Sequence, residues 1–434
     1  MSHNLYAQFH AAFGNHLNDT AIETDEGQHW TFGDLHRQSG QMANWLHSVG
    51  IKPGDRAMVQ VEKSVPALIF YLACLRAGVV YVPLNTAYQA AELAYFMENA
   101  EPSVFVSDPA TVGSLRELAQ RIGVPHWVTL GADGEGSLID AARQQETAQA
   151  VEPVASSDLA AILYTSGTTG RSKGAQLTHH NLASNAQTLH RLWGWQPGDV
   201  LMHALPIFHV HGLFVACHCA LLNASKMLWM GKFKPQTALE WMPEATVFMG
   251  VPTLYVRLLQ EADLTPERCA NMRLFISGSA PLLTDTFRAW QDRTGHTILE
   301  RYGMSETTML TSNPYRAEDG PRLGGTVGQP LPGVDLRCVA DDGQLCVPGD
   351  IGGIEVRGPN VFPGYWRMPE ANAKEFTADG WFKTGDVGQI NAEGYVTIVG
   401  RSKDLIITGG YNVYPAEVEG FINDLPGVGE SAVI

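Results

Sequence analysis

Short apolar runs alternate with amphipathic stretches along the first third of the chain. The strand-like runs cover residues 57–61, 79–83, 104–106 and 127–130, and the stretches with helical spacing cover 67–76, 92–99 and 115–122. Strands that alternate with helices of this length predict an α/β domain with a largely parallel sheet. Ligands of such sheets bind in the loops that follow the strands, so we look for chemistry in those loops.

The pattern changes twice further along. Residues 131–157 are polar and rich in Gly, Gln and Glu, which predicts a surface connection. After Pro314 the chain breaks into short β-like pieces separated by Gly and Pro, for example 324–330 and 354–359. This pattern of short strands and turns predicts a smaller, strand-rich subdomain.

Composition narrows the class of protein. With 434 residues, 45% of them hydrophobic, the chain can bury a large core and should divide into two or more domains. Its net charge of -16 repels polyanions, so we expect small-molecule substrates and no nucleic acid or anionic membrane surface as partner. Six scattered cysteines suit a reducing compartment, and Cys217 and Cys219 flank His218 in an apolar run that we interpret as core rather than as a metal site.

Neither a signal peptide nor a membrane span is predicted. The first residues lack a basic stretch followed by an apolar one, and the longest apolar segment, 65–84, is interrupted at Arg76 and Gly78. We therefore expect a cytoplasmic protein.

The most informative segment is residues 161–174, AILYTSGTTGRSKG, in which an apolar strand runs into a loop of Gly, Ser and Thr that ends in Lys173. Glycines let backbone N–H groups approach phosphate oxygens, hydroxyls add hydrogen bonds, and the lysine adds a charge. The glycine spacing is not that of a Walker A loop. A flexible Gly/Ser linker is the alternative, but linkers rarely follow a buried strand so directly.

This loop resembles the signature of the adenylate-forming enzymes, which include acyl-CoA synthetases, firefly luciferase and the adenylation domains of peptide synthetases. Six further stretches fit that superfamily in order: LPIFH at 205–209, SGSAP at 277–281, ERYGMSE at 300–306, GWFKTGD at 380–386, GRSKD at 400–404 and GGYNVYP at 409–415. The resemblance implies a large N-terminal domain over 1–400, with parallel sheets flanked by helices and a strand-rich subdomain. It also implies a hinge at 401–404, followed by the start of a small α+β C-terminal domain at 405–434.

The resemblance also implies roles for individual residues. Tyr302 would stack on adenine, Glu306 would bind Mg²⁺, and Asp386 would accept hydrogen bonds from the ribose, with Arg401 beside it. Lys403 would be the hinge residue, and Gly409, Gly410 and Tyr411 would line the tunnel for the thiol of coenzyme A. The remaining residues expected to contact ATP or AMP are Thr165, Ser166, Gly167, Thr168, Thr169, Gly170, Lys173, Gly278, Ser279, Ala280, Glu300, Arg301, Gly303, Met304 and Ser305.

Adenylation needs no nucleophile from the protein, because the substrate carboxylate attacks the α-phosphate of ATP. Catalysis then consists of positioning and charge neutralisation, and the candidate catalytic residues are Thr165, Lys173, Glu306 and His209. The superfamily's adenylation lysine lies near the end of the C-terminal domain and would follow Ile434. Because residues 430–434 form a strand-like run, we expect further residues in the native protein.

The residue before Tyr302 indicates which class of carboxylic acid is the substrate. Many relatives have a small side chain there, whereas this chain has Arg301. A buried guanidinium needs an anion, and Arg suits a carboxylate, so a substrate with a second carboxylate is expected. Ser277, His209 and Arg257 are further candidates for the acyl site; the alternatives are a core position for His209 and a surface ion pair for Arg257. Within the superfamily these motifs are most similar to bacterial malonyl-CoA synthetases.

Two alternatives remain. The first is an acyl-CoA ligase for another short, aromatic or fatty acid, with Arg301 paired to a protein carboxylate. The second is a non-catalytic nucleotide-binding protein without the C-terminal lysine. Transfer of the acyl group to a carrier protein is disfavoured because no carrier domain follows.

Overall fold

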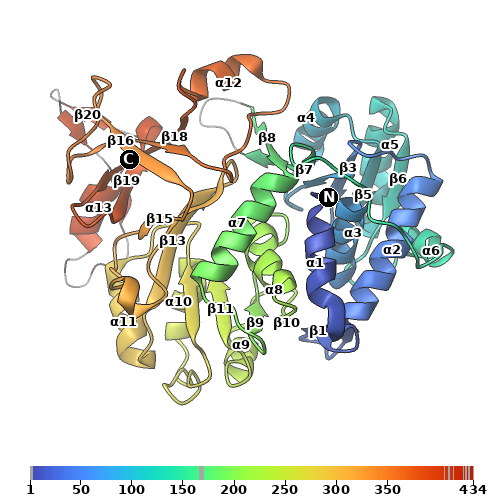
Figure 1. Ribbon diagram of the computed structural model, residues 1–434, viewed down its shortest axis with the longest axis horizontal. Coiled ribbons are helices and arrows are strands. Elements are labelled where there is room, and N and C mark those ends of the chain that lie inside the picture. Colours follow the sequence, from blue (N-terminus) through green and yellow to red (C-terminus); the bar gives the residue numbers. More distant parts are fainter. Residues whose placement is uncertain are drawn as a thin grey trace. The chain divides into compact units, whose positions relative to one another are not determined.

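The computed structural model describes residues 3–165, 171–404, 406–408, 411–413, 415–423, 425, 428 and 431–433. The chain divides into two compact units, and Figure 1 labels their elements. Unit 1 comprises residues 1–246 and 362–368, and unit 2 comprises 247–361 and 369–434. The division at 401–404 that the resemblance implies stays a prediction.

Unit 1 begins with the predicted alternation of strands and helices. A six-stranded sheet has the order β6-β5-β3-β4-β7-β8, with all pairs parallel except β7 and β8. The elements of this part are α1 (Leu5–Phe13), α2 (Phe32–Ser48), β3 (Arg56–Gln60), α3 (Val65–Arg76), β4 (Val80–Pro83), α4 (Ala90–Ala100), β5 (Val104–Ser107), α5 (Val112–Ile122), β6 (His126–Thr129), α6 (Ser137–Arg143), β7 (Leu159–Thr165), β8 (Lys173–Thr178) and α7 (His179–Leu192). The predicted strands and helices between residues 57 and 130 are therefore confirmed.

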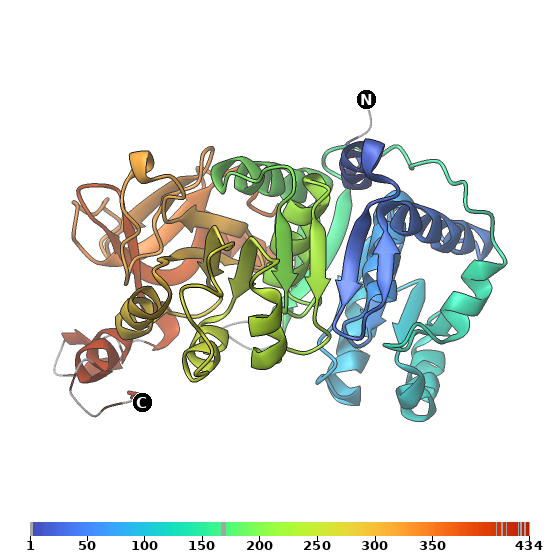
Figure 2. The same cartoon turned by 90° about the horizontal axis from the view of Figure 1, so that it is seen from below.

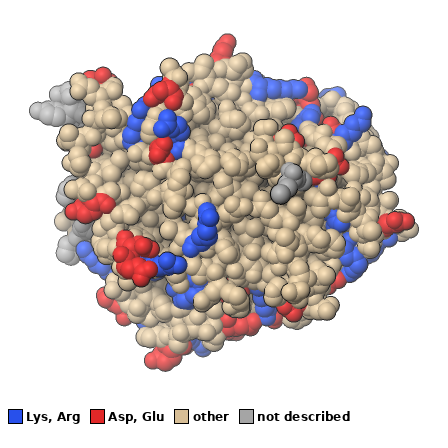
Figure 3. All heavy atoms as spheres, viewed as in Figure 1, with Lys and Arg blue, Asp and Glu red and all other residues tan. Residues whose placement is uncertain are grey.

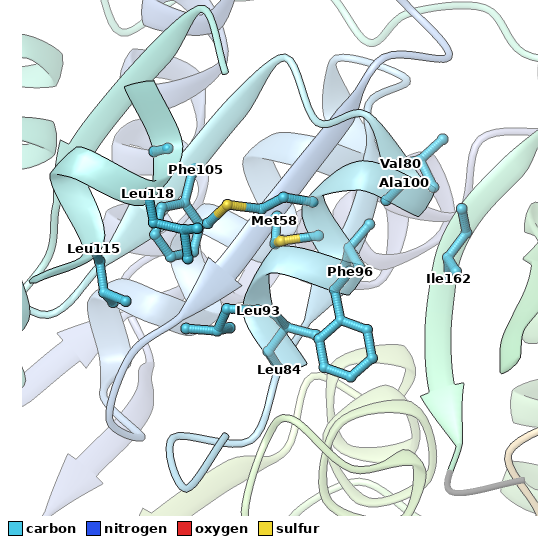
Figure 4. Close-up of a cluster of buried hydrophobic side chains, with 13 residues drawn as sticks. Met58, Val80, Leu84, Leu93, Phe96, Ala100, Phe105, Leu115, Leu118 and Ile162 are labelled. Carbon is cyan, nitrogen blue, oxygen red and sulfur yellow. The ribbon is translucent and has the colours of Figure 1, made fainter. Parts of the chain in front are cut away.

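A hydrophobic core joins this sheet to its helices. Met58 of β3 and Phe105 of β5 pack with Phe96 of α4 and Leu118 of α5, all nearly inaccessible to solvent (Figure 4). Helix α3 is buried from Ala67 to Arg76, as expected of a helix that is apolar all round and lies within a large protein. The apolar stretch at 65–84 is therefore a core helix followed by β4.

A second group of strands in unit 1 has the order β9-β10-β1-β2, in which β1 and β2 are antiparallel and the other pairs parallel. Its elements are β1 (Thr20–Thr24), β2 (His29–Thr31), β9 (Val200–His203), the π-helix η3 (His211–Cys217), α8 (His218–Leu222), β10 (Lys226–Trp229) and α9 (Pro235–Trp241). Cys217, His218 and Cys219 are fully buried, and the Tyr71 hydroxyl lies 2.7 Å from His218 Nε2. The interpretation of this cluster as core is confirmed.

Residues 131–157 depart from expectation. They include helix α6, whose Leu138 and Ala142 are buried four residues apart on one helical face. The prediction of a plain surface connection was therefore wrong for residues 137–143, because two apolar side chains are enough to seat one short helix against α2.

Unit 2 contains the predicted strand-rich part. Strands run in the order β15-β14-β13-β12-β11, with β11, β12 and β13 parallel, and a separate antiparallel sheet has the order β16-β17-β18-β19 (Figure 2). The elements are β11 (Val247–Gly250), α10 (Pro252–Leu259), β12 (Leu274–Ser277), α11 (Thr284–Thr294), β13 (Ile298–Met304), β14 (Thr308–Ser312), β15 (Gln329–Pro330), β16 (Asp335–Val339), β17 (Gly352–Arg357), α12 (Pro369–Glu375), β18 (Phe382–Ile390), β19 (Val396–Arg401), β20 (Ile406–Thr408), β21 (Tyr411–Val413) and α13 (Pro415–Asn423).

The surface charges and the helices of the described part bear on what the composition suggested. On the face drawn in Figure 3, blue Lys and Arg side chains stand singly or in small groups among red Asp and Glu. None of the described helices has both the length and the apolar character needed to cross a bilayer.

Candidate active site

Two paired strands of unit 1 flank the segment that was predicted to bind phosphate. Strands β7 and β8 are antiparallel, with Thr165 opposite Lys173, and the Thr165 hydroxyl lies 3.4 Å from the Lys173 carbonyl oxygen. The strands therefore fix both ends of the loop. Ser166, Gly167, Thr168, Thr169 and Gly170 lie outside the described residues.

Lys173 has an aromatic neighbour that the sequence did not suggest. Its Nζ lies 4.8 Å from the centre of the Tyr365 ring, a cation–π contact. Residues 364–366 pair with β8: Trp366 N–H donates to Gly174 O at 2.8 Å, and Gln176 N–H donates to Gly364 O at 3.2 Å. The pairing of residues 364–366 with β8 holds the Tyr365 ring next to Lys173. The two residues are 192 positions apart in the chain, so no local sequence pattern could reveal their contact.

His209 is exposed, at the start of the turn that leads into the π-helix. Its carbonyl oxygen accepts a bond from Leu213 N–H at 3.1 Å. The alternative of a core histidine is therefore wrong, because the ring is accessible to solvent.

A cavity of about 790 Å³ lies within unit 2. It is bounded by the residues that follow β12, by the end of β13 and by β18 and β19, which places it beyond the carboxyl ends of parallel strands, as expected. Eight residues predicted to bind nucleotide or acid share its wall: Ser279, Ala280, Glu300, Arg301, Tyr302, Gly303, Asp386 and Arg401.

Arg301 is the unusual group in this wall. Its side chain is only 2% exposed, and its Nε and Nη2 atoms have no hydrogen-bond partner among the described residues. Burial lowers the pKa of Arg301 to about 9. Nε and Nη2 form one edge of the guanidinium, the edge that binds a carboxylate through two parallel hydrogen bonds. An unsatisfied buried donor pair of this kind is costly unless a ligand completes it.

Gly278 sets the position of that guanidinium. A Cβ added at Gly278 would lie 2.5 Å from Arg301 Nη1, so only glycine leaves room for the side chain as it stands. The same Cβ would lie 2.6 Å from Cζ and 2.8 Å from Nε, so Gly278 packs closely against the guanidinium.

Two further polar groups beside Arg301 are buried. Glu300 accepts a bond from Leu282 N–H at 3.2 Å through Oε1, while Oε2 has no partner among the described residues. Burial raises the pKa of Glu300 to about 8, and the neighbouring Arg301 opposes this shift. Ser277, at the end of β12 and paired with Glu300, is fully buried, and its hydroxyl also lacks a partner in the described part.

Tyr302, Asp386 and Arg401 form a connected group. The Tyr302 hydroxyl donates to Asp386 Oδ2, and Arg401 Nε lies 2.6 Å from Asp386 Oδ1 across the paired strands β18 and β19. Burial raises the pKa of Asp386, and the neighbouring Arg401 opposes this shift. Each oxygen of the carboxylate keeps a lone pair for another donor.

The turn between β13 and β14 contains further residues that were predicted to bind nucleotide or metal. Met304 ends β13, Ser305 follows, and Glu306 is 5% exposed in the turn. Ser279, in the loop after β12, has a φ of 71°, a left-handed conformation that is uncommon for serine and is concentrated at functional sites.

Three other predictions fall outside the cavity wall. Arg257 is exposed on α10, and Lys403 is exposed in the short 3₁₀ turn at Ser402–Asp404. Gly409 and Gly410 lie outside the described residues, and only the backbone of Tyr411, in β21, is described. Their assignments to acid, hinge and coenzyme A stay predictions.

Comparisons with known proteins agree on one family. The model of the AMP-binding enzyme family matches residues 9–366. A mitochondrial malonate–CoA ligase, ACSF3 of Mus musculus, is 35% identical over 98% of this chain and 78% of its own length, and a malonate–CoA ligase of Arabidopsis thaliana is 32% identical over 100% and 77%. The ATP-bound crystal structure of MatB from Rhodopseudomonas palustris has 53% identity and a TM-score of 0.96, covering 100% of this chain and 86% of that one. The predicted α/β fold is confirmed.

Proposed function

The chain belongs to the AMP-binding enzyme family, and from this premise we propose that it is an ATP-dependent malonate–CoA ligase. It converts malonate and ATP to malonyl-adenylate and pyrophosphate, and then transfers the malonyl group to coenzyme A with release of AMP. The relatives named as malonate–CoA ligases and the similarity to MatB support this assignment.

The unpaired edge of Arg301 is the observation that carries the choice of acid. Malonate has two carboxylates, of which one is consumed in adenylation. The other pairs with Arg301, a residue of the cavity wall beside Tyr302, whose buried Nε and Nη2 atoms have no partner in the described part. A monocarboxylate would leave this buried charge unneutralised, at a cost of several kcal/mol.

The chain's other residues position the reacting groups. Tyr302 offers its ring to adenine, and Asp386 accepts the ribose hydroxyls on the lone pairs that Arg401 and Tyr302 leave free. Thr165, Lys173 and the loop between them bind the phosphate oxygens and stabilise the charge that develops when the malonate oxygen attacks the α-phosphate. The protein supplies orientation and charge, and the substrate supplies the nucleophile.

Magnesium fits the donor set as an ion that arrives with ATP. No group of three His, Cys, Asp or Glu side chains suited to a metal occurs among the described residues, whereas Glu306 offers one buried carboxylate. Mg²⁺ in nucleotide sites is held by one or two carboxylates together with phosphate oxygens and water, and it neutralises phosphate charge when bound. Glu306 is the residue that we assign to hold it.

The principal rival is a ligase for monocarboxylic acids in which a protein carboxylate neutralises Arg301. One candidate is Glu300, whose pKa is raised by burial to about 8, which disfavours its charged form, and whose Oε1 accepts from a backbone N–H. The structure therefore favours a dicarboxylate over this rival.

A substrate panel with an arginine variant tests the proposal. Pyrophosphate release by the complete gene product, with and without coenzyme A, should be faster with malonate than with acetate or hexanoate. Arg301→Ala should lower kcat/KM for malonate by roughly 10²-fold or more while ATP binding persists, since breaking a buried ion pair costs about 3 to 5 kcal/mol. Arg288→Ala, which removes an exposed arginine paired with Asp285, is the control and should change little.

Two results would contradict the assignment. Hexanoate as the preferred acid would identify the rival ligase. Nucleotide binding without any pyrophosphate release would identify a non-catalytic protein.

A further inference from the structure

Two of the six cysteines are direct neighbours in unit 2. Cys338 lies in β16, and the chain turns back so that Val339 pairs with Leu345 in an antiparallel bridge. Cys346 N–H then donates to the Cys338 carbonyl oxygen at 3.0 Å, which places the two cysteines opposite each other. All six cysteines are free thiols in the structure.

The spacing of this pair suits a disulfide. Opposed residues of an antiparallel pair have Cα atoms about 5.5 Å apart when they are hydrogen-bonded. Disulfides join residues whose Cα atoms are about 4.4 to 6.8 Å apart. Because the backbones of the two residues are already paired, closing the bond needs side-chain rotation rather than movement of strands.

The two thiols differ in access. Cys346 is partly exposed between Leu345 and Val347, which are 65% and 64% exposed, whereas Cys338 and the four cysteines outside this pair are buried. Cys346 is therefore the thiol that a reagent in solution meets first. Burial raises the pKa of Cys338, so its thiol reacts only when a sulfur is brought next to it.

We propose that Cys338 and Cys346 form an oxidisable pair that closes to a disulfide when a low-molecular-weight disulfide reaches Cys346. The Cys346 thiolate attacks one sulfur of the reagent, its S–S bond breaks, and the leaving thiolate takes up the proton that Cys346 lost. Cys338 then attacks the Cys346 sulfur of this mixed disulfide, and the second reagent thiol leaves with the proton of Cys338. Two electrons pass from the protein to the reagent, and a reducing thiol reverses both steps.

Closure also changes the neighbouring strand. The Cys338 thiol donates to the Gly388 carbonyl oxygen at 3.3 Å, and a disulfide has no proton to donate. Gly388 lies in β18, two residues after Asp386, where the pairing with β19 already contains an irregularity. We therefore expect oxidation to weaken nucleotide binding at Asp386, an effect that rests on the proposed function.

Formation of the disulfide can be measured on a single peptide. Both cysteines lie in one tryptic peptide, residues 338–357. After treatment of the folded protein with oxidised glutathione, this peptide should lose two hydrogen atoms and resist alkylation, and the titratable thiols should fall from six to four. Dithiothreitol should restore both values. Six alkylatable thiols after oxidation, or a link that joins any other pair, would overturn the proposal.

Variants separate the two steps. Cys338→Ala should stop the reaction at a glutathione adduct on Cys346, and Cys346→Ser should give neither adduct nor link at residues 338–357. The ATP dissociation constant of the oxidised wild-type protein should rise by roughly two- to tenfold, the range of one lost hydrogen bond, and should not change in Cys346→Ser. An equal dissociation constant before and after closure would refute the coupling to Asp386. Failure of the reduced protein to bind ATP would instead count against the proposed function.

Discussion

At the scale of single residues, a glycine packs against the arginine to which we assign the choice of acid. Gly278 packs against Arg301 Nη1, so a methyl group there must displace the guanidinium or the loop. Because Nε and Nη2 must meet a carboxylate with defined geometry, displacement of about 1 Å is expected to be costly.

Gly278→Ala should therefore lower kcat/KM for malonate by roughly 10²-fold, mostly through KM, while the ATP dissociation constant changes little. The control is Gly400→Ala in the cavity wall, where an added Cβ would meet nothing within 4 Å. Steady-state kinetics across malonate concentrations distinguish the two variants. Equal kinetics in both would show that Gly278 does not position Arg301.

Local motifs were enough to identify the residues of the cavity wall but not what holds them in place. Arg301 was predicted to be buried because it stands beside Tyr302 in a recognisable motif. Its contact with Gly278 joins the loop after β12 to β13, and the contact of Lys173 with Tyr365 joins segments 192 positions apart. Such contacts depend on the packing of the folded chain, which no sequence window contains.

At the scale of elements, a buried histidine ties two helices of unit 1 together. His179 begins α7, and its Nδ1 accepts a bond from Leu5 N–H, at the start of α1, at 3.1 Å. Burial lowers the pKa of His179 from 6.5 to about 4, against the opposing effect of Asp158. Protonation would remove the acceptor and place a positive charge at a helix N-terminus.

The sign of the pH effect follows from these values. Above pH 6.5 the histidine is neutral in both states, and as the pH falls towards 4 the unfolded chain takes up a proton that the folded chain does not. His179 should therefore contribute a loss of stability on acidification, of at most about 1.4 kcal/mol per pH unit in that window.

Urea unfolding at pH 7 and pH 5 measures this contribution. His179→Gln, which keeps an acceptor but cannot titrate, should lose less stability between the two pH values than the wild-type chain. An unchanged difference would show that other groups carry the pH dependence.

Sequence reasoning missed long helices such as α2 and α7 as well as two elements that are short or irregular. Helix α6 is seated by two apolar residues, and the π-helix at His211–Cys217 lies in an apolar run that has no distinguishing period. Elements such as α3 and the strands around it were predicted because apolar residues recur along them in regular patterns.

At the scale of the whole molecule, nucleotide binding should appear as global stability. A ligand present at about 100 times its dissociation constant adds ~2.7 kcal/mol to the free energy of unfolding if it binds only the folded chain. We expect ATP to have this effect, and Asp386→Asn to reduce it, since Asp386 faces the cavity between Tyr302 and Arg401. Thermal unfolding with ATP and with GTP at equal concentrations is the measurement, and equal shifts for both would contradict an adenine site at Tyr302.

Whole-molecule properties were predictable where they depend on composition alone. The net charge of -16 and the hydrophobic fraction indicated a large folded protein that acts on small molecules. The boundaries of the compact units were not predictable, because unit 1 recruits residues 362–368 from far along the chain.

The uneven burial of the cysteines has a practical side. Five of the six thiols are shielded, and Cys346 alone is partly open to solvent. A thiol-reactive dye applied to the reduced, folded chain thus has one natural point of attachment, in the segment between β16 and β17 of the sheet that carries Asp386. The unmodified sequence already offers the single-label fluorescent probe that other proteins acquire only after their surplus cysteines are replaced.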